Sequence, residues 1–144
     1  IQNEFLIWSS ISCLIAFLMT THYGLSGFMF FFGQSLVAVF LLETVNYIEH
    51  YGLRRKIKET GNFEPPGPQH SWNYSSFLTN MILFQLQRHS DHHQKANRPY
   101  QLLRHLPKAP QLPASYAAMI LLAWIPFLWF KVMNKRVEYY AVNF

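Results

Sequence analysis

The sequence predicts an all-α membrane protein, in which a transmembrane helical hairpin precedes a helical cytoplasmic cap with proline-rich loops. Residues 5–42 contain no Asp, Glu, Lys or Arg. All 12 Lys and Arg residues lie at Arg54 or later, so the net charge of +5 is concentrated in the second part of the chain. Only 13% of the 144 residues are charged, against about 25% in typical soluble domains. An uncharged apolar segment followed by a basic flank is typical of a membrane helix whose far end is cytoplasmic.

The same composition excludes several other classes. Intrinsic disorder is excluded because a chain that is 51% hydrophobic and 17% aromatic has to bury its side chains. The single cysteine, Cys13, excludes an internal disulfide framework. Basic nucleic-acid-binding domains do not usually carry a long uncharged apolar segment, so no nucleic-acid partner is expected.

Residues 1–50 are expected to hold two transmembrane helices, at about 5–21 and 28–48, joined by a turn at 20–27. The second helix would span roughly 30 Å, which matches the hydrocarbon thickness of a bilayer. The basic run at 54–58 follows directly, so we expect this run to be cytoplasmic and the turn to be on the opposite side. The alternative, two buried core helices of a soluble protein, is disfavoured because neither segment has a polar face.

Residues 51–144 are expected to form the cytoplasmic and interfacial part. The stretches 59–72 and 97–113 are interrupted by prolines and predict loops. A helix is predicted from 77 to about 93, with a serine at its N-cap. The apolar segment 117–130 contains a proline and is too short to span a membrane easily, so it is expected to lie at the interface or against the cytoplasmic part.

A histidine cluster lies near the end of the predicted 77–93 helix. His89, His92 and His93 are spaced i, i+3 and i+4, so a helix would place them on one face, which Gln85 continues. Three neutral imidazoles suit Fe, Zn, Cu or Ni and do not suit Ca or Mg. The alternative is a solvent-exposed histidine run without a ligand.

His50 is a second candidate ligand. Glu43, Asn46 and Tyr47 precede it by seven, four and three residues, which places a polar stripe on one face of an apolar helix. Such a stripe is expected to face protein, and an ionisable group there is a candidate functional residue. A lone histidine near a helix end is more often a satisfied interfacial residue, so the proposal depends on the second cluster.

Two eight-residue motifs then indicate a family. Residues 46–53 (NYIEHYGL) and 86–93 (LQRHSDHH) resemble two motifs of the integral-membrane alkane monooxygenases. Residues 70–73 (HSWN) and 98–105 (RPYQLLRH) are similar to the same family, in the same order. The resemblance extends over residues 43–116, which is half of the chain.

The resemblance implies a bundle of membrane helices whose cytoplasmic cap holds two non-haem irons. By this likeness the iron ligands are His50, His89, His92 and His93. Histidine ligands need partners that fix their orientation, and the candidates for this role are Glu49, His70, Asp91 and His105. The two earlier histidine boxes of the family are absent, and the chain opens with Ile1 in place of Met. We therefore expect a C-terminal-half fragment that is inactive alone, with the missing histidines before its first residue.

The activity implied by the resemblance is hydroxylation of the terminal carbon of n-alkanes to 1-alkanols with O2. Electrons would come from rubredoxin, supplied by rubredoxin reductase and NADH. The expected location is a bacterial inner membrane, in contact with membrane lipid and with the metal site on the cytoplasmic side. The basic residues after Arg54 have two interpretations. They attract an acidic electron carrier, or they only set the membrane topology and contact anionic lipid.

Two alternative functions remain open. The first is a related membrane di-iron hydroxylase or desaturase that acts on xylene-type or fatty acyl substrates. The second is a membrane metal-binding protein that is not an enzyme.

Overall fold

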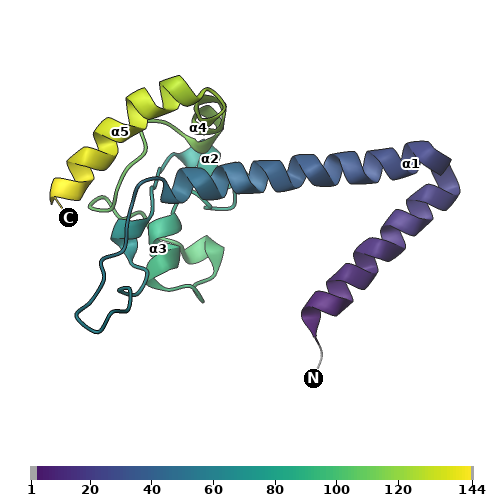
Figure 1. Cartoon of the computed structure of the whole chain (residues 1–144), viewed down its shortest axis with the longest axis horizontal. Coiled ribbons are helices and arrows are strands. Elements are labelled where there is room, and N and C mark those ends of the chain that lie inside the picture. The colour runs from purple at the N-terminus through teal and green to yellow at the C-terminus, as the bar shows by residue number, and fades with distance from the viewer. Residues whose placement is uncertain (1–2, 144) are drawn as a thin grey trace. The chain divides into compact units, whose positions relative to one another are not determined.

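The computed structural model describes residues 3–143, and its regular elements are all helices (Figure 1). Within that range there is no β-strand, only the isolated bridges Ile57–Phe63 and Asn73–Gln111. The predicted all-α class is therefore confirmed. The elements are α1 (Glu4–His50), η1 (Pro68–His70), α2 (Phe77–Ile82), α3 (His89–Gln94), η2 (Tyr100–Leu102), α4 (Tyr116–Ala123) and α5 (Pro126–Asn143). The chain divides into two compact units, Ile1–Glu43 and Thr44–Phe144.

The first unit consists of most of α1, whose 47 residues make it long and apolar enough to cross a membrane. Its large apolar side chains do not pack into a core; Leu36 and Leu42, for example, are 70% and 66% exposed. Exposure of this kind disfavours the alternative of buried core helices and is expected of side chains that face lipid.

The predicted turn at residues 20–27 is reduced to one non-helical residue, Gly24, with φ 62° and ψ −146°. The helix continues on both sides of it and bends visibly in Figure 1. Two threonine hydroxyls in this stretch donate hydrogen bonds to carbonyls of the preceding helical turn, from Thr20 to Ala16 O at 2.8 Å and from Thr21 to Leu18 O at 3.1 Å. Only glycine takes the left-handed conformation at little cost. The division of α1 into two membrane crossings stays a prediction.

The hydrophobic core lies in the second unit, where it surrounds the last turns of α1. It comprises Ile48, Trp72, Leu112, Tyr116, Met119, Trp129 and Met133. The indole Nε1 of Trp72 also donates a hydrogen bond of 2.7 Å to the carbonyl of Tyr51. The end of α1 is therefore fixed against α4, α5 and the loop that follows η1.

The prediction of one helix over residues 77–93 is wrong. The structure has two short helices, α2 and α3, separated by a turn in which Phe84 and Gln85 have φ values of 50° and 63°. Gln85 thus lies outside the helix that carries the histidines and cannot continue its face.

Buried hydrogen bonds explain this break. The fully buried Gln87 side chain donates to Thr79 Oγ1 at 2.6 Å and to Asn80 Oδ1 at 2.8 Å. Its Oε1 accepts from the backbone N–H of Tyr116 at 2.9 Å. A straight helix would place position 87 about 12 Å along the axis from position 79, so these contacts require the chain to fold back.

The apolar segment 117–130 is divided between α4 and α5, which meet at a turn after Ala123. Pro126 opens α5, where its missing N–H costs nothing. Helix α5 then continues to Asn143, beyond the predicted segment. The location of segment 117–130 at a membrane interface stays a prediction.

Candidate metal centre

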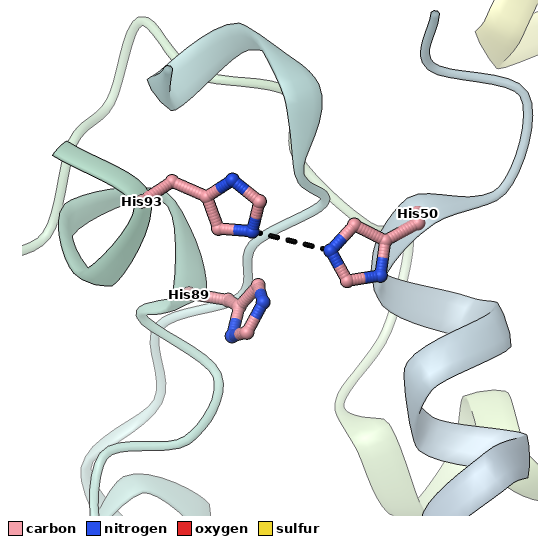
Figure 2. Close-up of side chains that lie close together, drawn as sticks. All are labelled: His50, His89 and His93. Atoms are coloured by element: carbon pink, nitrogen blue, oxygen red, sulfur yellow. Dashed lines mark hydrogen bonds between the residues drawn. The ribbon is translucent and has the colours of Figure 1, made fainter. Parts of the chain in front are cut away.

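Three histidines from two helices converge in the second unit (Figure 2). His50 is the last residue of α1, while His89 and His93 are one turn apart on α3. One nitrogen from each ring lies within 4.8 Å of the other two. Figure 2 shows the ring of His93 pointing at that of His50, with His89 beside them.

The hydrogen bonds define which nitrogen of His50 is available. Its Nδ1 lies 2.9 Å from the carbonyl oxygen of Asn46, which can only accept, so Nδ1 carries the proton. Its Nε2 therefore presents a lone pair, and the Nε2 of His93 lies 3.1 Å from it. The other nitrogen of His93, Nδ1, is buried and has no hydrogen-bond partner among the described residues.

This donor set fits a metal ion. A metal holds imidazole nitrogens at about 2.0–2.1 Å, so two nitrogens bound side by side lie about 3 Å apart. The 3.1 Å between His50 and His93 matches that spacing. An all-imidazole set suits Fe, Zn, Cu or Ni.

The environment keeps His89 and His93 neutral, as metal binding requires. Burial, followed by repulsion from the other histidines of the cluster, lowers the pKa of His89 to about 3. Burial, followed by repulsion from His50 and His92 and then from His70 and Arg55, lowers the pKa of His93 to about 4. Both rings are therefore uncharged near neutral pH, with one nitrogen of each free to bind a metal.

Glu49 lies beside the cluster as the sequence predicted, and it is 4% exposed. Its Oε1 is 3.4 Å from Nδ1 of His89 and accepts a hydrogen bond of 3.1 Å from the hydroxyl of Tyr116. Burial raises the pKa of Glu49 to about 8, so in the metal-free protein this group is largely protonated at neutral pH. In its ionised form it would favour a proton on Nδ1 of His89 and leave Nε2 as the ligand atom. Tyr116, which sequence reasoning missed, holds that carboxylate in place.

Two of the predicted residues are exposed. His92 lies outside the group of three, although its ring centroid is 5.5 Å from that of His89. His105 is likewise exposed and lies outside the group. The structure therefore gathers His50, His89 and His93, and places His92 at the edge of the cluster.

His70 is buried, but both of its ring nitrogens contact protein. Nδ1 accepts a hydrogen bond of 2.9 Å from the backbone N–H of Gly67, so Nε2 carries the proton and donates to Glu64 at 2.9 Å. His70 therefore closes the 64–70 loop. It still lines a cavity of about 360 Å³ together with His50 and His93.

The two residues between His89 and His92 are both fully buried. The backbone N–H of Ser90 donates to Asn73 Oδ1 at 2.8 Å, and its hydroxyl donates to the Pro68 carbonyl at 2.6 Å. Asp91 accepts hydrogen bonds from Arg98 and Arg104. Burial alone would raise the pKa of Asp91, but these bonds lower it below its usual range. The sequence analysis named the motifs 70–73 and 98–105, which contain Asn73, Arg98 and Arg104, but did not predict that these residues hold the histidine segment.

Comparison with known proteins shows which family the chain belongs to. The sequence profile described as fatty acid desaturase matches residues 2–123. The chain belongs to the fatty acid desaturase family. This family member is 56% identical over 140 residues to alkane 1-monooxygenase 2 of Alcanivorax borkumensis, covering 97% of this chain and 37% of that protein.

A second relative of this desaturase-family chain has the same name as the first. Alkane 1-monooxygenase 2 of Pseudomonas aeruginosa is 51% identical over 141 residues, again 97% of this chain and 37% of the relative. A more distant relative, a xylene/toluene monooxygenase hydroxylase component of Pseudomonas putida, is 30% identical over 100 residues, 69% of this chain and 26% of that protein. The chain thus spans little more than a third of the length of its alkane monooxygenase relatives.

Proposed function

We propose that this chain is part of a membrane non-haem di-iron monooxygenase that converts n-alkanes to 1-alkanols with O2. The identity of 56% over 97% of the chain to a protein named alkane 1-monooxygenase carries this proposal. The three converging imidazoles give it a chemical basis, because they form a metal-binding group in the part of the chain that those relatives share.

The ligands divide between two ions. His50, His89 and His93 hold one iron, because their nitrogens already lie within 4.8 Å of one another. His92, next to them and exposed, serves the second iron together with histidines outside this chain. The bound irons supply the O2 chemistry needed to break an unactivated C–H bond, for which no amino-acid side chain is a strong enough oxidant. The protein positions the ligands, keeps His89 and His93 neutral, and orients His89 through Glu49.

The electrons come from rubredoxin, which receives them from NADH through rubredoxin reductase. Basic residues near the cluster support this partner, since they attract an acidic carrier. Arg55 lines the same cavity as His50 and His93. This arrangement is consistent with a cytoplasmic metal site in a bacterial inner membrane, approached by the carrier from the basic side.

The test is an octane assay with the full-length protein in membranes, supplied with rubredoxin, its reductase and NADH. We expect 1-octanol, two irons per protein, and loss of both in a His93→Ala variant. An iron-loaded protein that forms no alcohol from octane or hexadecane would contradict the proposal. A protein that binds zinc in place of iron and consumes no O2 would indicate a metal-binding protein without this activity.

A second candidate is hydroxylation of an aromatic methyl group. The relative named as a xylene/toluene monooxygenase component favours it, although its identity of 30% is well below the 56% of the alkane enzyme. Octane and m-xylene offered in the same assay separate the two functions, and we expect octane to be the faster substrate.

A further inference from the structure

We propose that Asp91 is a positioning residue for the metal centre. Through Arg98 and Arg104 it fastens helix α3 to residues 98–104, and so holds His89 and His93 toward His50. This inference rests on the proposed function, since it concerns the same metal centre. It gives a role to the 98–105 motif, none of whose residues belongs to the group of three histidines.

Helix α3 cannot orient its histidines by itself. It has six residues, and its N-cap residue, Arg88, makes no side-chain capping hydrogen bond. Isolated helices shorter than about 12–15 residues are marginal in water. The turn before it contains Phe84 and Gln85 in left-handed conformations, so α2 does not continue into α3. The direction of His89 and His93 must therefore come from tertiary contacts.

Asp91 makes the charged contacts among them. Its side chain is 0% exposed. Its Oδ2 accepts from the backbone N–H of Arg104 at 2.9 Å and from Nη1 of Arg98. Its Oδ1 accepts from Nη2 and Nε of Arg104 at 3.1 and 3.3 Å. Four donors, two of them on one guanidinium fork, fix the carboxylate in position and orientation.

The placement of Asp91 on α3 explains how this contact acts on the ligands. Residues two positions apart on a helix point about 200° apart, so Asp91 lies opposite both His89 and His93. A second anchor joins the same two segments, because Arg88 Nη1 donates to the Leu103 carbonyl at 2.6 Å. The 98–104 segment thus supports α3 from behind, while the histidines face α1.

The experiment compares four variants in the full-length protein purified in detergent: Asp91→Asn, Arg104→Gln, the double variant, and Glu59→Gln. Asp91→Asn keeps the shape and removes the charge. Arg104 is 59% exposed, so its variant should fold even if Asp91→Asn does not. Glu59, an exposed acid outside α3, controls for the change in net charge.

Two quantities are measured. The first is the dissociation constant for cobalt(II), followed by its visible absorption bands. The second is amide hydrogen exchange of α3 in the metal-free protein, which needs no metal. We expect Asp91→Asn to weaken cobalt binding 10- to 100-fold, the usual range for partners of metal ligands, and to speed exchange in α3. Arg104→Gln should do the same to a smaller extent, and Glu59→Gln should do neither.

Adding Arg104→Gln to Asp91→Asn should cause no further loss, because both changes remove the same interaction. Unchanged cobalt affinity or unchanged α3 exchange in Asp91→Asn would overturn the inference, as would fully additive effects. If Asp91→Asn does not fold, the same two measurements on Arg104→Gln decide. If the wild-type protein binds no cobalt, the proposed metal centre fails, and α3 exchange alone then decides the role of Asp91.

Discussion

The Nε2 atoms of His50 and His93 lie 3.1 Å apart, although 43 residues separate the two histidines in the sequence. One of them ends the long apolar helix and the other lies on the short helix α3. Two ring nitrogens that face each other at this distance can share a proton or bind the same metal ion. Because Nδ1 of His50 already donates to Asn46, its Nε2 is an acceptor and a ligand atom in either case.

The first prediction concerns this pair of histidines. His93→Ala in the full-length protein should weaken cobalt(II) binding strongly, because it removes one of three nitrogens that lie within 4.8 Å of one another. His105→Ala is the matched control, since His105 is exposed and outside that group. Titration of the metal-free proteins measures both. Equal affinity in wild type and His93→Ala would remove His93 from the metal centre.

The second prediction concerns pH. An unfolded histidine has a pKa of about 6.5, while those of folded His89 and His93 are about 3 and about 4. Between these values the unfolded chain binds protons that the folded, metal-free protein does not, so the contribution of these two histidines to stability falls as pH falls below 6.5. Above pH 6.5 this contribution is constant. Glu49, whose pKa burial raises to about 8, contributes in the opposite direction. Between pH 7.5 and 5 the loss should reach about 2 kcal/mol per histidine.

Thermal unfolding of the metal-free protein at several pH values measures this loss. The double variant His89→Asn/His93→Asn provides the comparison, because asparagine does not titrate. As pH falls from 7 to 5 it should lose less stability than the wild type, because the opposing contribution of Glu49 is present in both proteins. Identical slopes would show that these two histidines are accessible to protons in the folded state.

Helical spacing and the family resemblance singled out four histidines, and the structure brings three of them together. The spacing places His89, His92 and His93 around one side of a helix. Which of these histidines face α1 depends on the rotation of α3. Ser90 and Asp91 hold α3 through hydrogen bonds to residues distant in the sequence, which helical spacing does not reveal. The structure accordingly brings His89 and His93 to His50 and leaves His92 exposed.

The break between α2 and α3 could not be read from local pattern either. It depends on Gln87, whose side chain bonds to Thr79, Asn80 and Tyr116. Nothing in the hydrophobic periodicity marks Gln87 as buried. By contrast, the composition of the long uncharged stretch was enough to predict a helical, apolar segment there, although α1 has a kink at Gly24 where a turn between two helices was expected.

The third prediction concerns membrane orientation. In a Cys13→Ser background, a membrane-impermeant maleimide applied to intact cells should label a cysteine replacing His22 but not one replacing Lys58. The basic run that includes Lys58 follows α1 directly and is expected to stay cytoplasmic. Both positions should react in permeabilised cells. Labelling of position 58 but not of position 22 in intact cells would show the opposite orientation.

The last prediction concerns Gly52, two residues after His50. Gly52 has φ +72°, and a Cβ built on it would lie 2.5 Å from Cγ2 of Val137. Gly61 has a similar φ of +78° but nothing within 4 Å of such a Cβ, which makes it a matched control. Each alanine variant should lose about 1–2 kcal/mol from the left-handed backbone. Gly52→Ala should lose more, because it also pushes α5 away from the end of α1, and it should weaken cobalt binding at His50. Adding Val137→Ala should restore the metal affinity by making room for the new methyl group. Denaturant unfolding and cobalt titration of these variants measure both effects, and equal losses at positions 52 and 61 would show that the contact with Val137 has no role in holding His50.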